Sequence, residues 1–327
     1  MGRRLRVAVV GRRFGQDVHA PAFAADPRCE LVGVVGRDGW RDVVGSADVD
    51  AVSIAVPPAA QAPIAEAAAA AGKHLFCEKP LARTLDEAER ILRAAERAGV
   101  VHGVDFLFPE VEAWRQARQR LAEGVIGRVL HFAYAWRVET WASRVNADSW
   151  KSRPDEGGGA LGNFASHVFH NIEWLLGPVL TMGPFAFPGG ARTGRGVDGQ
   201  VLLAGDVAGT IAISTDAFCG TGHLLEVFGE DGTLRLANDG ADFVAGFSLS
   251  EARRASGHFV PVVSGSAPDG DGRRAPVAAL VRRFVDAVGG GLPMTPNLSH
   301  AMRVQMLMAQ AQQHVAASFP VPAVEPA

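Results

Sequence analysis

Short, uninterrupted apolar runs alternate with helical segments over the first third of the chain, and this alternation constrains the fold most. Three such runs are Leu5 to Val10, Leu31 to Val35 and Ala51 to Val56. Runs of this kind are typical of strands buried on both faces of a parallel sheet. The segment from Thr84 to Ala98 instead repeats apolar residues at helical spacing behind a threonine suited to cap it. The alternation predicts an α/β domain with a doubly wound parallel sheet.

The pattern changes after residue 107. From Arg128 to Val138 apolar and polar side chains alternate, and further strand-like runs follow up to Ala237. Such alternation is typical of strands with one face in a core and one face open. Asp231-Gly232, between the last two runs, is a strong hairpin signal. We therefore expect a large antiparallel sheet, followed by two helices at 276–288 and 299–318.

The composition excludes several classes of partner. A formal net charge of −3 disfavours non-specific binding to nucleic acid or to acidic membranes. No apolar run reaches the roughly 18 residues that a membrane span needs. The three cysteines, Cys29, Cys77 and Cys219, are far apart and form no CxxC pair. We therefore expect no disulfide framework and no metal site, and a reducing, cytoplasmic compartment.

The first predicted strand runs into a glycine turn of the kind that dinucleotides need. Gly11 fits the first position of a GxGxxG pattern, Arg13 stands at the second and Gln16 at the third, and Gly15 partly compensates. Backbone N–H groups of such a turn approach a pyrophosphate. The alternative is a tight turn without a nucleotide, because an arginine at the second position crowds the phosphates. We expect the cofactor to contact Gly11, Arg13, Phe14 and Gly15.

Other candidate ligands follow the later strands. Gly36-Arg37 stands where an acidic residue would read the ribose of NAD, so it favours NADP, although a solvent-facing arginine is the alternative. Pro57 follows the third strand, and Glu78 and Lys79 follow the fourth. Side chains at the carboxyl ends of parallel strands face the ligand crevice. We expect Lys79 to hold a substrate hydroxyl, while an ordinary surface turn is the alternative.

A helix behind the glycines at 157–159 carries three polar residues on one face. Asn163, His167 and His170 lie at positions i, i+4 and i+7. Histidine is the usual general acid or base near neutral pH. A buried, hydrogen-bonded histidine face is the alternative. No carboxylate sits close by in this segment, so we do not expect a metal.

Taken in order, these motifs resemble the Gfo/Idh/MocA oxidoreductases, a family that includes glucose–fructose oxidoreductase and inositol dehydrogenases. The resemblance is carried by AGKHLFCEKPLA at 71–82, by the segment from Phe106 to Pro109 and by the glycine run with its asparagine and histidine. It implies a Rossmann domain at 1–107 and, at 108–327, a substrate-binding and oligomerisation domain, with the last helix packing back on the first domain. It also implies a homodimer or homotetramer through the large sheet, a catalytic lysine at Lys79 and a catalytic histidine at His167.

The chain departs from the family pattern at several positions. Asn163 replaces the family's usual aspartate four residues before the histidine, His170 replaces an aspartate three residues after it, and Ala165 replaces a glycine. Gln61 stands where the family has a further histidine, and only 36–49 connect the second and third strands. With Arg13, the short connection weakens the expectation of a bound nucleotide.

The sequence therefore favours an NAD(P)-dependent oxidoreductase of a sugar, cyclitol or related small polar substrate. Lys79 would stabilise charge on the reacting oxygen, His167 would relay a proton, and Asn163 would orient them. Trp150, Lys151 and His170 would hold the substrate. Two alternatives remain: an enzyme of another class, such as a lyase, isomerase or glycosidase, or a non-catalytic ligand-binding or assembly protein that has lost its nucleotide.

Overall fold

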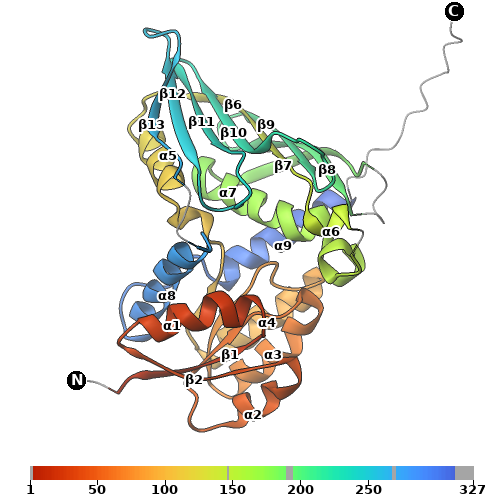
Figure 1. The fold of residues 1–327 in the computed structure, drawn as a ribbon, viewed down its shortest axis with the longest axis vertical. Helices are drawn as coiled ribbons and strands as arrows, with labels where there is room; N and C mark the ends of the chain where they lie inside the picture. Colours follow the sequence, from red (N-terminus) through yellow and green to blue (C-terminus); the bar gives the residue numbers. More distant parts are fainter. Residues whose placement is uncertain (1–2, 146, 189–193, 267–269, 314–327) are drawn as a thin grey trace, which may run out of the picture.

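The computed structural model describes residues 3–145, 147–188, 194–266 and 270–313. Two sheets stand at opposite ends of the molecule, with helices between them (Figure 1). This arrangement confirms the predicted α/β fold, with a parallel sheet in the first third and a large, mostly antiparallel sheet after it.

The first sheet is parallel throughout, in the order β2-β1-β3-β4-β5. Its strands are β1 (Leu5–Val10), β2 (Cys29–Val35), β3 (Ala51–Ile54), β4 (His74–Cys77) and β5 (His102–Val104). The apolar runs of β1 and β3 exist because these strands lie inside the sheet and are covered on both faces. The same expectation is wrong for the run from Leu31 to Val35, because β2 is an edge strand and Val32 is 42% exposed. The order places the carboxyl ends of β1, β3 and β4 side by side, where ligands bind in such sheets.

Four helices and one π turn belong to this sheet. They are η1 (Gly15–His19), α1 (Ala20–Ala25), α2 (Trp40–Gly45), α3 (Pro58–Ala70) and α4 (Leu85–Ala98). The predicted cap on α4 is present, since Thr84 accepts a hydrogen bond from the backbone N–H of Glu87. The sequence did not predict α1 and α2, because six residues each are too few to show a helical period.

The second sheet has eight strands in the order β13-β12-β11-β10-β6-β9-β8-β7. The strands are β6 (Val129–Arg137), β7 (Val179–Ala186), β8 (Gly196–Leu203), β9 (Val207–Ser214), β10 (Gly222–Gly229), β11 (Gly232–Asn238), β12 (Ser248–Arg253) and β13 (Phe259–Val263). All neighbours are antiparallel except β6 and β9, and the predicted hairpin joins β10 to β11. The strands β7, β12 and β13 were not predicted.

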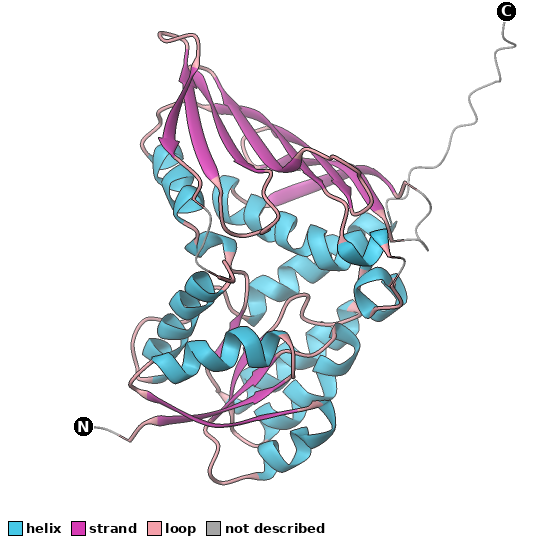
Figure 2. Ribbon diagram, in the orientation of Figure 1, coloured by secondary structure: helices cyan, strands magenta, loops and turns pink. Residues whose placement is uncertain are grey.

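Helices cover one face of this second sheet and leave the other face open (Figure 2). The helices of this part are α5 (Glu112–Ala122), α6 (Trp141–Arg144), α7 (Ser166–Leu176), α8 (Arg274–Val288) and α9 (Leu298–Gln313). Both C-terminal helices reach the first sheet, because α8 contacts α1 and α9 contacts α4. The predicted last helix extended to 318, and its end lies outside the described residues. Among the described residues, no helix is long and apolar enough to cross a membrane.

Candidate active site

The glycine turn after β1 is built for close backbone packing. Gly11 has φ +139°, and a Cβ added there would lie 2.1 Å from the carbonyl oxygen of Ala55. A Cβ on Gly15 would lie 3.0 Å from Cγ1 of Val9, so this glycine lets the first helical turn approach the sheet. These are two of the tasks that glycines perform in dinucleotide-binding turns. Arg13 is exposed rather than folded into the turn. The backbone therefore fits a dinucleotide despite the degenerate fingerprint.

Several arginines surround the carboxyl end of β2. Arg37 is exposed next to Gly36, and Arg41 stacks on the ring of Trp40 with 4.5 Å between its guanidinium carbon and the ring centre. Arg12 also reaches this corner, because a Cβ on Gly36 would lie 3.3 Å from Arg12 Nε. The sequence did not single out Arg12, since it neighbours Gly36 only after β1 and β2 have paired.

The turn that carries Lys79 is held rigidly at the end of β4. Nε2 of Gln61 donates hydrogen bonds to the carbonyl oxygens of Glu78, at 3.1 Å, and of Pro80, at 2.8 Å. The Lys79-Pro80 peptide bond is cis. Gln61, on α3, therefore fixes the Lys79 turn to this helix.

Lys79 reaches the second domain. Its Nζ donates to the backbone oxygen of Asn163 at 3.1 Å and to Oδ1 of the same residue at 3.2 Å. The structure therefore brings together two of the three residues that the sequence assigned to catalysis. Asn163 lies in a π turn, η6 (Ala160–Ala165), that precedes α7, so the expected helix begins with wider turns than an α-helix.

The glycines at 157–159 serve backbone packing. A Cβ on Gly158 would lie 1.8 Å from the carbonyl oxygen of Trp150, and a Cβ on Gly157 would lie 2.9 Å from Cβ of Pro58. The glycines therefore dock η4 (Trp150–Ser152) and the start of α3 against the π turn. Pro57, the N-cap of α3, stands beside this contact. Lys151 lies on η4 and its side chain is exposed.

His167 is buried in an apolar and aromatic setting. The edge of its ring meets Phe108, with 4.9 Å between the ring centres, and its Nδ1 has no hydrogen-bond partner among the described residues. Burial lowers the pKa of His167 well below its ordinary value, and the neighbouring ammonium of Lys79 lowers it further. The imidazole is therefore neutral at neutral pH.

His170 packs in the core instead of facing a substrate. It is 5% exposed and stacks flat on Phe106, with ring centres 4.1 Å apart. Burial lowers its pKa to about 3. This packing does not favour the predicted contact of His170 with a substrate. Tyr134 is likewise buried, and its hydroxyl pairs with His223 Nε2 at 2.5 Å.

Lys79 has an unusual electrostatic setting. Burial lowers its pKa to about 8, and the positive charges of Lys151 and Arg273 act in the same direction. The negative charges of Glu78 and Asp105 oppose this shift. Of Lys79 and His167, Lys79 is therefore the group that can exchange a proton near neutral pH, whereas the sequence assigns that task to His167.

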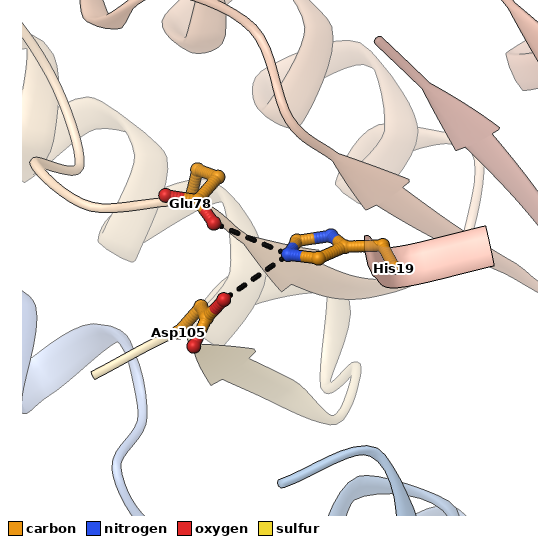
Figure 3. Close-up of side chains that lie close together, drawn as sticks. All are labelled: His19, Glu78 and Asp105. Atoms are coloured by element: carbon orange, nitrogen blue, oxygen red, sulfur yellow. Dashed lines mark hydrogen bonds and ion pairs between the residues drawn. The ribbon is translucent and has the colours of Figure 1, made fainter. Parts of the chain in front are cut away.

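A buried cluster that the sequence did not predict lies next to the Lys79 turn (Figure 3). Nε2 of His19 is 3.1 Å from Oε1 of Glu78 and 3.2 Å from Oδ2 of Asp105, and Nδ1 is 2.8 Å from Oγ of Ser53. The Nε2 and the two carboxylate oxygens all lie within 4.8 Å of one another, a donor set that a divalent metal also accepts. When Nε2 carries a proton, the imidazole instead donates to both carboxylates. One signal in the sequence could have indicated this cluster: Ser53, Glu78 and Asp105 all stand at the carboxyl ends of adjacent strands.

The chain matches two family models. One, an oxidoreductase family with an NAD-binding Rossmann fold named GFO_IDH_MocA, covers residues 38–106, and the other, the GFO/IDH/MocA C-terminal domain, covers residues 114–235. An uncharacterized oxidoreductase of Synechocystis sp. (strain ATCC 27184 / PCC 6803 / Kazusa) is 30% identical over 93% of this chain and 92% of its own length. Levoglucosan dehydrogenase of Pseudarthrobacter phenanthrenivorans is 32% identical over 54% of this chain and 52% of its own length.

Solved structures share the fold. Levoglucosan dehydrogenase in complex with NADH and levoglucosan superimposes with a TM-score of 0.80 at 23% identity, over 96% of this chain and 98% of that one. A 3-ketoreductase from Actinomadura kijaniata in complex with NADP gives a TM-score of 0.78 at 21% identity, over 95% and 98% of the two chains. The fold and the site thus define an oxidoreductase with a dinucleotide-binding domain. More particularly, the chain belongs to the GFO/IDH/MocA family.

Proposed function

We propose that this protein transfers hydride between NADP(H) and a carbon–oxygen bond of a sugar, cyclitol or related small polar substrate. The observation that carries the proposal is the meeting of Lys79 with Asn163 across the two domains, beside the neutral His167. Relatives named as dehydrogenases or reductases of sugars and of inositol support the substrate class. A binding module has no need for a lysine whose pKa is lowered at such a junction.

In the oxidative direction, Lys79 takes the proton of the substrate hydroxyl. The neutral amine of Lys79 becomes an ammonium, and this charge also stabilises the alkoxide that forms at the transition state. When bound, NADP⁺ supplies the acceptor for the hydride, with its two electrons, that leaves the substrate carbon as the carbonyl forms. His167 stays neutral and hydrogen-bonds the reacting oxygen, and Asn163 orients the Lys79 amine through two hydrogen bonds.

The glycine turn and the corner at the end of β2 hold the cofactor in this proposal. Gly11, Phe14 and Gly15 face the pyrophosphate, together with Arg13, whose exposed side chain can bind a phosphate instead of crowding it. Arg37 and Arg12, on either side of Gly36, favour the 2′-phosphate of NADP. Lys151 and Trp150, neighbours on η4, stand on the substrate side in this proposal, because the charge of Lys151 acts on Lys79.

The open face of the second sheet supports self-association. Thr181, Gln200, Thr210 and Phe228 line a hollow of about 590 Å³ on this sheet. Figure 2 draws no helix over the outer face of the sheet. An antiparallel sheet with one uncovered face commonly packs against a second copy. We expect a homodimer or homotetramer, and a monomer at micromolar concentration by sedimentation would contradict this.

The placement of the cysteines supports a reducing compartment. No two of the three are paired; Cys29 and Cys77 are buried and Cys219 is exposed. An exposed free thiol is uncommon where disulfides form readily. We therefore assign the protein to the cytoplasm.

The test begins with the nucleotide. Purified protein is titrated with NADPH and with NADH, and the nicotinamide fluorescence gives both affinities. A panel of sugars and cyclitols then supplies a substrate for turnover. Lys79→Ala and His167→Ala should each lower kcat by about 10²–10³, the range found when one stabilising group is removed. Full turnover in both variants would refute the assignment, and absence of nucleotide binding would favour the non-catalytic alternative.

A further inference from the structure

The carboxylates nearest to Lys79 do not pair with it. Nζ of Lys79 hydrogen-bonds only the two neutral oxygens of Asn163 among the described residues. Glu78 is its neighbour in sequence, yet Oε1 of Glu78 accepts from His19 and Oε2 accepts from the backbone N–H of Lys79. Figure 3 shows both Glu78 and Asp105 turned toward the imidazole of His19.

His19 is placed to hold these two carboxylates. It is fully buried, and its other ring nitrogen is fixed by Ser53 on the central strand β3. The rings of Phe14 and Phe76 stand against the imidazole, with ring centres 5.1 and 5.2 Å away. With these rings in contact, the imidazole has no surface exposed to water. A doubly protonated imidazole can donate to Ser53 and to the carboxylates at once, and it supplies the positive charge that two buried carboxylates require.

The protonation states agree with this geometry. Burial acts to lower the pKa of His19, but its hydrogen bonds to Asp105 and Glu78 outweigh burial and raise the pKa to about 9. Burial, together with the charge of Glu78, raises the pKa of Asp105 to about 7. Oδ1 of Asp105 is buried without a partner, so this carboxyl is the easier of the two to protonate. These directions favour an imidazolium at His19 that faces the Glu78 carboxylate at neutral pH.

We propose that His19 is a positioning residue that withdraws the Glu78 and Asp105 carboxylates from Lys79 and so leaves the Lys79 amine without an ion-pair partner. The inference rests on the proposed function, in which Lys79 must release and take up a proton near neutral pH. The backbone of the Lys79 turn is already fixed by Gln61. Rotation of the Glu78 side chain is therefore the motion that would pair Lys79, and His19 prevents it.

Four charged groups act on the pKa of Lys79. Glu78, beside it on the same turn, and Asp105, after β5, raise its pKa, while Lys151 on η4 and Arg273 before α8 lower it. Loss of His19 frees the Glu78 carboxylate to approach the Lys79 amine. An opposite charge brought close stabilises the ammonium, so the pKa of Lys79 should rise by about 1–3 units when His19 is replaced.

The experiment observes Lys79 directly. The chain contains three lysines, so protein labelled with isotopic lysine gives three side-chain signals, which Lys73→Arg and Lys151→Arg assign. The Lys79 signal is titrated in the full-length wild type and in His19→Gln, which keeps a donor but carries no charge. Glu78→Gln should shift the pKa of Lys79 in the opposite direction, downward. His74→Gln is the matched control, because His74 is a half-buried histidine at the other end of β4.

Opposite shifts in His19→Gln and Glu78→Gln, with no shift in His74→Gln, would support the proposal, because general destabilisation cannot move one pKa both ways. An unchanged Lys79 pKa in folded His19→Gln would overturn it. If His19→Gln does not fold, Glu78→Gln decides alone, and an unshifted Lys79 there would also overturn it. The titration needs no substrate. A Lys79 that titrates as expected in a protein without turnover would support the coupling and overturn only the proposed function.

Discussion

Asn163→Asp tests whether the uncharged neighbour of Lys79 sets its pKa. Oδ1 of Asn163 lies 3.2 Å from Nζ of Lys79, so the substitution places a carboxylate at that distance without changing the size of the side chain. Two unit charges at this separation attract by about 5 kcal/mol at an effective dielectric constant of about 20. Burial of the new charge opposes part of this attraction. Opposite charges this close raise a lysine pKa by about 1–3 units, so Lys79 should titrate at about 9–11 instead of about 8.

The consequence for turnover has a definite sign. Substrate oxidation needs the neutral amine, so each unit of increase in the Lys79 pKa lowers the oxidation rate at pH 7 about tenfold, and the rate recovers at higher pH. The reverse reaction needs the ammonium, so its range extends to higher pH instead. Asn163→Leu is the control for shape, because it removes the Oδ1 acceptor without adding charge and should not raise the pKa of Lys79.

Two measurements together can refute this reasoning. The lysine signal reports the pKa of Lys79, and the pH dependence of kcat reports the group that limits turnover. An unchanged Lys79 pKa in Asn163→Asp would refute the electrostatic account. A raised Lys79 pKa with an unmoved kcat profile would show that another group exchanges the proton.

Three further outcomes are expected. Arg37→Ala should weaken NADPH binding by about 1.5–3 kcal/mol, the range for hydrogen bonds to a charged group, and leave NADH unchanged; equal losses for both would refute the phosphate contact. Gly158→Ala should lower the free energy of unfolding, measured by urea denaturation, by about 1–3 kcal/mol, because the new Cβ would lie 1.8 Å from the Trp150 carbonyl oxygen. Gly45→Ala is the control: its Cβ would meet nothing within 4 Å, so the same free energy should change by less than about 0.5 kcal/mol. His223→Gln should make the free energy of unfolding less sensitive to acid. Burial lowers the pKa of His223 to about 3, so below pH 6.5 the unfolded state binds a proton that the folded state does not bind. This difference lowers the free energy of unfolding of the wild type by about 2 kcal/mol at pH 5 and by almost nothing at pH 7.5. A stability difference between wild type and this variant that stays constant over that range would contradict the burial of a neutral imidazole.

The sequence predicted most of the first domain because its signals are local. A continuous apolar run identifies β1, and Thr84 with its helical period identifies α4. The position of Lys79 follows from the same logic, since a residue just after a buried parallel strand faces the crevice. The unpredicted strands β12 and β13 have no local signal of this strength. They lie at one end of the sheet, where β13 is the edge strand, and they become ordered by pairing with β11 and with each other.

The sequence could not predict the contacts between distant residues that set the protonation states of the site. His19 is separated from Glu78 by 59 positions and from Asp105 by 86. These side chains come together because β3, β4 and β5 are neighbours in the sheet and because His19 ends the π turn η1 beside them. For the same reason the roles that we propose for Lys79 and His167 differ from the expected ones, since residue type alone makes histidine the neutral-pH group. Burial beside an ammonium keeps that histidine neutral, and burial among cations brings the lysine close to neutral pH, so the environment and not the residue type selects the group that exchanges the proton.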